Sequence, residues 1–416
     1  MLNLAFIGTF KPIPSHWVAL ADQVLVSGAN FVIGVILART FGVHVFGVYV
    51  IATTFLYYAN TFQSSLVISP MMTALPNELD LSKRRDLMSG FLGYALVMCV
   101  LSVLGVAFIV YVLGKIFTSM RLGENAFPLL LAIVGFQTQD WLRRALYAIR
   151  NSSMALLLDM LAYGGHLVGL TILYFVAKLS PANALNSMAV FFLSSALLIL
   201  FFLKIIPSYF QAKSVIAKHW RDSRDFFMSW QFQWAGSQGL MLFGGALLGP
   251  QTVGALRASA NLTSLVNVLF QWMENVIPVR AVTHLKNGGI SQMYRFLKRV
   301  ASIGGLIFGV IVVGLIFLSE QLLVIVYGEE YRPYSLFLIL QAIYIWLSHY
   351  YKMELFAYRA MQKTLEIAKA SFILAIVSIT SGVIGLFFLQ GKAIVLALIL
   401  GQSISHIYLI YRRKFL

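Results

Sequence analysis

The sequence predicts an all-α polytopic membrane protein with twelve transmembrane helices, arranged as two six-helix bundles around a central cavity. Hydrophobic residues make up 60% of the 416 residues and charged residues 11%, and the mean hydropathy is +0.83. Too little polar surface is left to cover a soluble protein of this size. Apolar runs long enough to cross a hydrocarbon core of roughly 30 Å recur along the whole chain. Polar and glycine landmarks of the first half also recur in the second half, which favours two related bundles.

Each apolar run is interpreted as one membrane crossing, because about 20 mostly apolar residues span the bilayer. No stretch is left for a soluble domain. The first sixteen residues contain no signal-peptide pattern, so the first helix itself is expected to target the chain. Charged residues fall inside the fourth, eighth and tenth runs. The twelve expected helices cover residues 17–41, 44–68, 87–113, 126–149, 154–177, 184–205, 228–248, 252–277, 300–318, 334–357, 366–389 and 392–411.

The first two helices are expected to form a hairpin. One face of the first helix carries a polar stripe, because Gln23, Ser27, Asn30 and Gly34 recur at the spacing of one helix face. The apolar run breaks at Gly42 and restarts a few residues later. A tight turn between two membrane helices is the simplest interpretation.

The distribution of lysine and arginine predicts the topology. With both termini in the cytoplasm, 24 of the 31 basic residues lie on the cytoplasmic side or at adjoining helix ends. Cytoplasmic segments of membrane proteins carry such an excess, so this split favours an even number of helices with both termini inside. The seven basic residues left for the outer side are Arg39, Lys115, Arg121, Lys178, Arg257, Arg332 and Lys392.

The chain is expected to divide into an N-terminal six-helix lobe (1–207), a cytoplasmic linker (208–227) and a C-terminal six-helix lobe (228–416). The spacing G-x-x-x-[FV]-G occurs at 42–47 and again 207 residues later at 249–254. Further pairs are offset by 208 residues, namely Pro70 with Pro278, Gln23 with Gln231 and Asn30 with Gln238. Because six helices separate the copies, they predict a parallel repeat about the membrane normal.

A second basic segment, residues 279–299, follows the eighth helix and mixes apolar with basic residues. Two interpretations stay open. It forms a short helix on the anionic cytoplasmic surface of the membrane, or it is an ordinary solvated loop.

Polar stripes within the membrane helices are the main functional signal. Polar side chains are costly in lipid, so these faces are expected to meet each other or a water-filled cavity. The alternative is interhelical hydrogen bonding between packed helices. The candidate substrate-binding residues are Arg39, Arg257, Asn30, Asn60, Asn261, Gln271 and Lys352.

Two of these arginines carry the anion-binding hypothesis. Arg39 and Arg257 are expected near the outer ends of helices, against the trend of the other basic residues. A guanidinium offers a planar fork of donors suited to a phosphate or pyrophosphate. For Arg39, an alternative is that the side chain extends to the lipid headgroups.

Three acidic residues, Asp22, Asp159 and Glu274, are placed deepest in the membrane. Each is a candidate to carry a coupling proton, or to be partnered structurally, and the sequence does not choose. Asp140 precedes Arg143 and Arg144 by three and four residues, which predicts a local ion pair at the membrane surface.

No enzyme signature is present. The histidines are scattered, no Cys/His cluster has metal-ligand spacing, and the lone cysteine, Cys99, forms no intrachain disulfide. The net charge of +16 is spread over short loops and forms no groove-binding motif, so the membrane rather than nucleic acid explains it. A protein that is not an enzyme and that uses no cofactor and no metal is expected.

Two motifs resemble a known family. Residues 27–47 read S-G-A-N-F-x-x-G-x-x-L-A-R-x-x-G-x-x-x-F-G, and residues 323–331 read L-x-x-x-Y-G-x-x-Y. Both are similar to polysaccharide flippases of the Wzx type, within the multidrug/oligosaccharidyl-lipid/polysaccharide exporter superfamily. The resemblance implies two six-helix bundles whose cavity opens alternately to the two sides. The position of Arg39 also matches one in the related lipid II flippases, where cavity arginines engage the lipid pyrophosphate.

The resemblance implies a flippase that moves an undecaprenyl-diphosphate-linked oligosaccharide across the bacterial inner membrane for O-antigen, capsule or exopolysaccharide synthesis. A proton or sodium gradient, or the membrane potential, would drive it, and a polysaccharide polymerase and glycosyltransferases would be its partners. No motif fixes the glycan, and Arg257 is assigned from its stripe rather than from the family. The alternatives are a multidrug or metabolite exporter of the same fold, and a membrane glycosyltransferase or polymerase.

Overall fold

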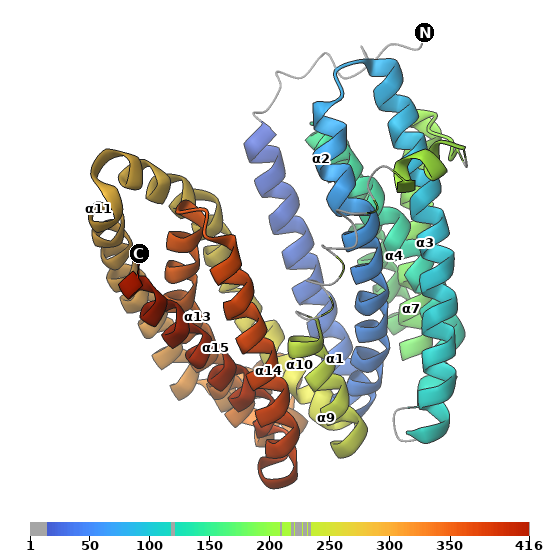
Figure 1. Ribbon diagram of the computed structural model, residues 1–416. Coiled ribbons are helices and arrows are strands. Elements are labelled where there is room, and N and C mark those ends of the chain that lie inside the picture. The colour runs from blue at the N-terminus through green and yellow to red at the C-terminus, as the bar shows by residue number, and fades with distance from the viewer. Residues whose placement is uncertain are drawn as a thin grey trace. The chain divides into compact units, whose positions relative to one another are not determined.

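The computed structural model describes residues 15–117, 121–208, 210–217, 220, 227, 231 and 234–415. All regular elements in these ranges are helical (Figure 1). The chain packs as two compact units. The first unit comprises Met1–Ile33 and Phe55–Trp230, and the second comprises Gly34–Thr54 and Gln231–Leu416. The first helix therefore contributes to both units. The lobe boundaries expected from the sequence stay a prediction.

Each of the twelve predicted segments falls on a helix within the described residues. The elements are α1 (Ser15–Gln63), η2 (Ser64–Ile68), α2 (Ser69–Asn77), α3 (Leu81–Ile116), η4 (Leu122–Asn125), α4 (Ala126–Ala148), α5 (Ser152–Asp159), η5 (Met160–Gly164), α6 (Gly165–Phe175), α7 (Pro181–Leu203), η6 (Ala235–Gly239), α9 (Leu240–Leu248), α10 (Pro250–Ser264), α11 (Asn267–Phe317), α12 (Ser319–Tyr327), η7 (Glu329–Tyr334), α13 (Ser335–Ala360), α14 (Thr364–Leu389), α15 (Lys392–Arg412) and η8 (Arg413–Phe415).

Seven helical stretches of the described chain have the length and apolar composition needed to cross a membrane. The longest, Leu20–Asn77, has 58 residues, far more than the roughly 20 that one crossing needs. It is interrupted at Gly42, where φ is 69° and ψ is 171°. Glycine adopts this conformation without a steric penalty, so the predicted break between the first two helices lies at the expected residue.

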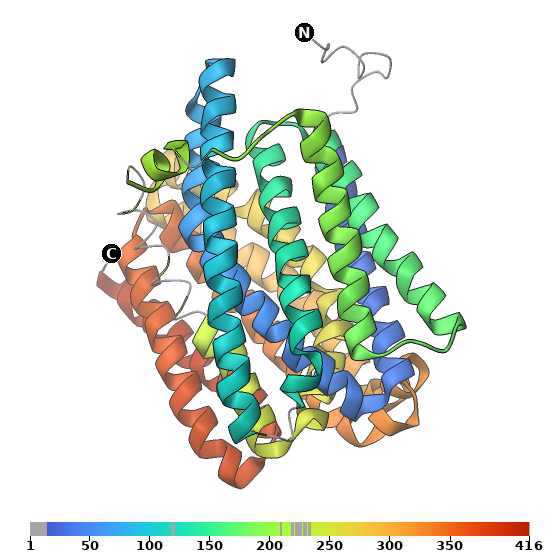
Figure 2. The ribbon, with the colours of Figure 1, turned by 90° about the vertical axis from the view of Figure 1, so that its right-hand side faces the viewer.

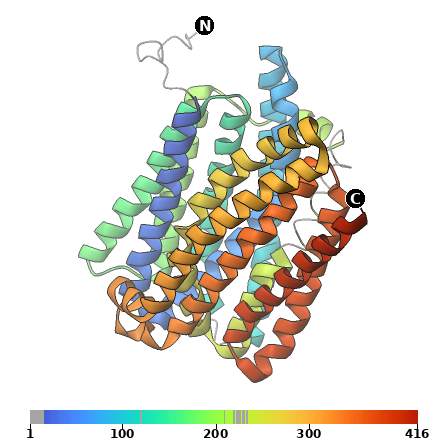
Figure 3. The ribbon, with the colours of Figure 1, turned by 90° about the vertical axis from the view of Figure 1, so that its left-hand side faces the viewer.

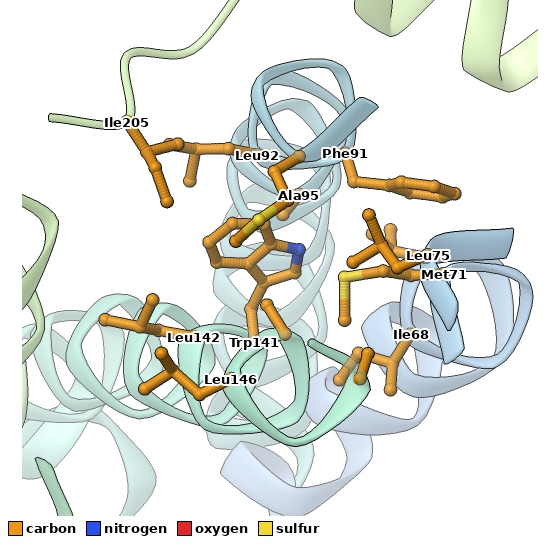
Figure 4. Packing of buried hydrophobic residues seen from close by; sticks show 14 of the residues in the cluster. Ile68, Met71, Leu75, Phe91, Leu92, Ala95, Trp141, Leu142, Leu146 and Ile205 are labelled. Carbon is orange, nitrogen blue, oxygen red and sulfur yellow. The ribbon is translucent and has the colours of Figure 1, made fainter. Parts of the chain in front are cut away.

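The core of the first unit surrounds Trp141 on α4. This indole is fully buried, and Figure 4 shows it between α2 and α3, with Met71, Leu75, Leu92 and Ala95 around it. Figure 2 shows α4 and α7 side by side, and Gly135 allows this approach because a Cβ there would lie 2.8 Å from the carbonyl oxygen of Ala189. Burying aromatic and aliphatic surface of this extent fixes α4 and the polar residues that it carries.

The first half of the predicted linker packs on the first unit as far as it is described. Residues 210–217 are helical, and residues 209, 218–219 and 221–226 lie outside the described residues. The backbone N–H of Ser208 donates to the carbonyl oxygen of Ser89 at 3.1 Å. A Cβ at Gly93 would lie 2.8 Å from the carbonyl oxygen of Ser208, so the small residue permits this close packing on α3.

Asp80 caps the N-terminus of α3, just before the basic residues Lys83 and Arg84. The side chain of Asp80 accepts hydrogen bonds from the backbone N–H groups of Ser82 and Lys83. A hydrogen bond from the Ser82 hydroxyl, together with these two backbone bonds, holds the pKa of the Asp80 carboxyl below its usual range. A charged cap at this position stabilises the helix start.

The second basic segment, residues 279–299, belongs to α11 and is helical on both sides of a break at Gly288 and Gly289. Figure 3 shows the two arms of α11 running antiparallel from this break. Gly289 has a φ of 69°, which suits glycine. Of the two interpretations, the solvated loop is wrong, because the segment is helical on both sides of the break. The helical interpretation fits better, although the two arms continue the neighbouring helices of α11 instead of forming a separate short helix.

Charged contacts anchor the C-terminal helix at the end of the second unit where α11 breaks. Arg412 Nε pairs with Glu366 Oε2 at 3.0 Å, and Arg413 Nη1 pairs with Glu354 Oε1 at 3.2 Å. The Arg413 guanidinium also lies over the ring of Tyr294, 4.8 Å from its centroid. These contacts tie α15 to α11, α13 and α14.

Candidate functional site

A buried charged cluster lies inside the first unit, where α1, α4 and α5 contribute its members. Asp22 and Asp159 have fully buried side chains, and the Arg143 side chain between them is 14% exposed. Two of the three candidate coupling acids are thus brought together. We refer to Asp22, Arg143 and Asp159, with Tyr147 and Gln139, as the acidic cluster.

Direct contacts hold each member of the acidic cluster. Arg143 Nη2 donates to Asp22 Oδ2 at 2.8 Å, and Arg143 Nε lies 2.6 Å from Asp159 Oδ2 as an ion pair without hydrogen-bond alignment. The Tyr147 hydroxyl donates to the same Asp22 oxygen at 2.5 Å. The amide of Gln139 donates to Asp159 Oδ1 at 2.5 Å. Asp22 Oδ1 is buried and accepts no hydrogen bond from a described residue.

The acidic cluster is one positive charge short. Two carboxylates carry two negative charges and Arg143 supplies one positive charge, so the fully ionised set has a net charge of minus one. An uncompensated charge in a buried, low-dielectric site is expensive. The cluster therefore has the composition of a site that binds one proton or one monovalent cation.

The helix that carries Asp159 is distorted directly after this residue. A π-helical turn, η5, covers Met160–Gly164 between α5 and α6. Such turns inside α-helices occur frequently at functional sites, because they change which side chains face one side. Here the turn follows a buried carboxylate.

A second ionic group lies beside the acidic cluster on the next face of α4. Arg144 Nε is 3.4 Å from Asp140 Oδ1, and the side-chain amide of Asn60 donates to Asp140 Oδ2 at 3.2 Å. The predicted local ion pair therefore involves Arg144, whereas Arg143 pairs with acids from other helices. Asn60, a candidate substrate residue, has a structural partner.

The break at Gly42 in α1 is held by the segment that carries the second family-like motif. Arg39 Nη1 donates to the carbonyl oxygen of Ile325 at 2.8 Å. The backbone N–H of Val43, at the restart of the helix, donates to Glu330 Oε2 at 3.2 Å, and the Tyr331 hydroxyl donates to the carbonyl oxygen of Ala38 at 3.1 Å. The guanidinium of Arg39 is exposed and supports this packing in the structure.

Arg257 lies on the polar face of α10 in the second unit. It is half-buried and makes no hydrogen bond or ion pair with any described residue. One turn further, Asn261 donates to the Tyr327 hydroxyl at 3.2 Å, and that hydroxyl donates to the carbonyl oxygen of Ala258 at 3.1 Å. Arg257 is thus the member of this face whose charge is left uncompensated within the described residues.

Two candidates that the sequence placed in different roles form a pair. Lys352 on α13 contacts the carboxylate of Glu274 on α11. The ammonium also lies 5.1 Å from the ring centroid of Phe270. The two side chains are 27% and 41% exposed, so this pair has access to solvent, in contrast to the acidic cluster.

The remaining candidates are less informative. Asn30 is exposed on α1. Gln271 falls in α11, and its side chain lies outside what the structure describes. Sequence reasoning missed Arg143, Tyr147 and Gln139 as a unit. The available signal was two deep acids, Asp22 and Asp159, that need a cation, and an arginine inside the fourth apolar run.

Comparison with known proteins identifies the fold. No family model and no curated protein sequence matches the chain. Among solved structures, the chain is similar to the lipid II flippase MurJ in an inward closed conformation, with 16% identity over 97% of this chain and 88% of that chain and a TM-score of 0.74. It is also similar to an inward-facing multidrug resistance MATE family transporter of the MOP superfamily, with 13% identity over 94% of both chains and a TM-score of 0.70.

A third similar structure is a MOP superfamily transporter from Pyrococcus furiosus, whose binding pocket is described as having reverse polarity. It shares 14% identity over 96% of this chain and 91% of that chain, with a TM-score of 0.55. Similarity at these identities establishes the fold. The prediction of an all-α polytopic membrane protein with twelve helices in two six-helix bundles is confirmed.

Proposed function

We propose that this protein is a flippase that moves an undecaprenyl-diphosphate-linked oligosaccharide across the bacterial inner membrane by alternating access. The observation that carries the proposal is Arg257, a half-buried guanidinium on a polar helix face with no ionic partner among the described residues. An unpaired arginine costs roughly 2.5–3.5 kcal/mol on insertion scales at the centre of a membrane helix, which is an upper value for Arg257 nearer the outer end, and the charge still favours a partner. A diphosphate cargo would supply the missing counter-charge.

The acidic cluster supports an ion-driven cycle. Its net charge of minus one is relieved when one proton binds, and a membrane protein can couple that event to a conformational change. We assign the coupling role to Asp22 and Asp159. Glu274 is the weaker candidate, because Lys352 already neutralises it in a partly exposed pair.

The same contacts favour an anionic cargo over a cationic drug. The polar face of α10 offers a guanidinium, an amide and hydroxyl groups, which are donors to phosphate oxygens. A cationic drug would instead need an accessible uncompensated carboxylate. Glu274 has its lysine, and the uncompensated charge of the acidic cluster lies on fully buried side chains. A multidrug exporter is therefore the second candidate. Glycosyltransferases would act before this step, and a polysaccharide polymerase would act after it.

Deletion of the gene followed by complementation tests the proposal. Synthesis and translocation are separate steps, so the deletion strain should build the lipid-linked precursor and accumulate it in the cytoplasmic leaflet. Arg257→Lys keeps the charge but loses the planar fork, and should restore part of the export. Arg257→Ala should restore little, at normal membrane abundance. The measurement is surface polysaccharide, together with the leaflet distribution of the precursor.

Arg121→Ala is the matched control, because Arg121 is an exposed arginine whose partner, Glu124, lies 2.9 Å away. It should complement fully, since an exposed pair contributes little. Normal surface polysaccharide in a deletion strain without a second exporter would refute the flippase. Full export by Arg257→Ala would remove Arg257 from the cargo site.

A further inference from the structure

The second unit contains a cavity of about 380 Å³. Its lining includes neither Arg257 nor Glu274. Three helix connections line it, namely the end of α9 with the start of α10, the end of η7 with the start of α13, and the link from α14 to α15. These connections belong to the end of the unit that is expected to face the outside. The volume falls within the range of small-molecule sites, roughly 300–1,000 Å³.

The walls of this cavity are polar and aromatic rather than purely apolar. Gln251 and Gln390 contribute amides and Thr252 contributes a hydroxyl. The rings of Tyr334 and Phe337 lie beside each other, with centroids 5.7 Å apart. Amides and hydroxyls can donate to and accept from neighbouring hydroxyl groups, while the aromatic faces pack on apolar C–H surfaces. A sugar ring presents both kinds of surface.

One lining residue is charged. Lys392 begins α15 at the cavity and is exposed, and it forms no hydrogen bond or ion pair between its ammonium and any described residue. The described lining contains no acidic side chain. The cavity therefore has a net positive charge and a donor for an anionic group.

The link from α14 to α15 is unusual at Gln390, and the glycine that follows it has an ordinary helical backbone. Gln390 has a φ of 52° and a ψ of −140°, which residues with a side chain rarely adopt. Gly391 follows, and a Cβ there would lie 2.6 Å from Thr252 Cγ2 and 2.8 Å from Phe337 Cζ. Non-glycine residues held in such conformations cluster at binding sites, where the surrounding structure fixes them. The link therefore holds the Gln390 amide and Lys392 at the cavity.

We propose that this cavity binds a carboxylate-bearing sugar residue. The ammonium of Lys392 pairs with the carboxylate, the amides of Gln251 and Gln390 contact ring hydroxyls, and Tyr334 packs on the ring face. This inference rests on the proposed function, in which the cargo carries an oligosaccharide, and it names an acidic sugar as the part that the outer end of the second unit recognises.

Binding of monosaccharides to the purified full-length protein tests the inference. The probes are glucuronate, glucose, which has the same ring without the carboxylate, and inorganic phosphate. Dissociation constants come from saturation-transfer NMR titrations. Glucuronate should bind about tenfold more tightly than glucose, the effect of one charge-assisted contact. Phosphate should not displace it, because phosphate lacks the ring.

Two variants separate charge from ring recognition. Lys392→Gln should remove the preference for glucuronate and leave glucose binding unchanged. Tyr334→Leu should weaken both sugars and keep the preference. Lys178→Gln is the control, because Lys178 is an exposed lysine of the first unit, and it should bind as the unchanged protein does.

Equal affinity for glucuronate and glucose, an equal loss in Lys178→Gln, or displacement of glucuronate by phosphate would each overturn the acidic-sugar site. These measurements need no transport. If the deletion strain exports normally while Lys392 still confers the preference, the flippase proposal fails and the sugar site stands. If export fails on deletion and no sugar binds, the sugar site alone fails.

Discussion

Arg143 is shared by two buried carboxylates, and this sharing decides what each residue of the acidic cluster can do. Removing one partner of a buried ion pair usually costs about 3–5 kcal/mol, because a charge is left without compensation. Substituting Arg143 would leave both Asp22 and Asp159 in that state. Neutralising one of the acids would instead leave a balanced pair, so it is the informative change.

We expect Asp159→Asn to accumulate normally and to lose the response of transport to an imposed pH gradient. The variant pairs one carboxylate with one guanidinium, so the cluster no longer needs a proton. Gln139 keeps a hydrogen-bonding partner in the new amide. The measurement is the flipping rate of a lipid-linked substrate analogue in proteoliposomes, with and without the gradient.

Glu274→Gln is the matched acid-to-amide control. Glu274 is 41% exposed beside Lys352, so its variant should keep the gradient response. A gradient response that persists in Asp159→Asn would exclude the acidic cluster as the coupling site. Loss of the response in Glu274→Gln alone would move that role to the second unit.

At the level of whole elements, the two glycine hairpins of the sequence repeat pack directly on each other within the second unit. A Cβ at Gly47 would overlap the backbone of Pro250, and a Cβ at Gly254 would overlap the carbonyl oxygen of Val43. Backbone therefore meets backbone at both crossings. Each hairpin supplies the surface that the other requires.

We expect Gly47→Ala to lower the stability of the protein by about 1–3 kcal/mol, the usual cost of inserting atoms into a packed site. Gly105→Ala in α3 is the control, since a Cβ there meets nothing within 4 Å. Alanine has the higher helix propensity, so the control should be neutral or stabilised. Unfolding in detergent measures both. A Gly47→Ala protein as stable as the control would contradict the close approach.

The motif L-x-x-x-Y-G-x-x-Y has a structural explanation at this level. Tyr327 contacts α10 and Tyr331 contacts α1, while Gly328 between them has a φ of 109° that favours glycine. The sequence could show the spacing and not the partners, because both tyrosines contact residues more than 60 positions away. The contacts of this motif therefore have a role in helix packing, whether or not the motif also contacts the cargo.

For the molecule as a whole, composition and periodicity were sufficient to predict the helices. Apolar runs are local, so the positions of the helices could be read directly, and Gly42 could be recognised as a break because its surroundings on both sides are apolar. Some bounds could not, since the predicted helix 252–277 is divided between α10 and α11. Contacts between distant helices are not local. The pairing of Arg143 with Asp22, and the position of Lys392 at a cavity, depend on how the chain packs and could not be read from spacing.

We expect reporter fusions after Lys213 and after Leu416 to report the cytoplasm, and fusions near Gly249 to report the outer side. The reason is the excess of lysine and arginine on the segments assigned to the cytoplasm. Paired phosphatase and fluorescent-protein fusions distinguish the two sides. A C-terminus outside the cytoplasm would contradict the predicted orientation.

The division of α1 has a consequence for fragments of this protein. Residues 34–54 pack with the unit that also contains Gln231–Leu416, so they bury their apolar surface against helices from the other half of the sequence. A fragment ending after residue 207 would carry this segment without its packing surface, and a fragment starting at residue 228 would have that surface uncovered. Neither half would then bury all of its apolar surface alone. Two separately synthesised halves would assemble only if residues 34–54 of the first packed on the second.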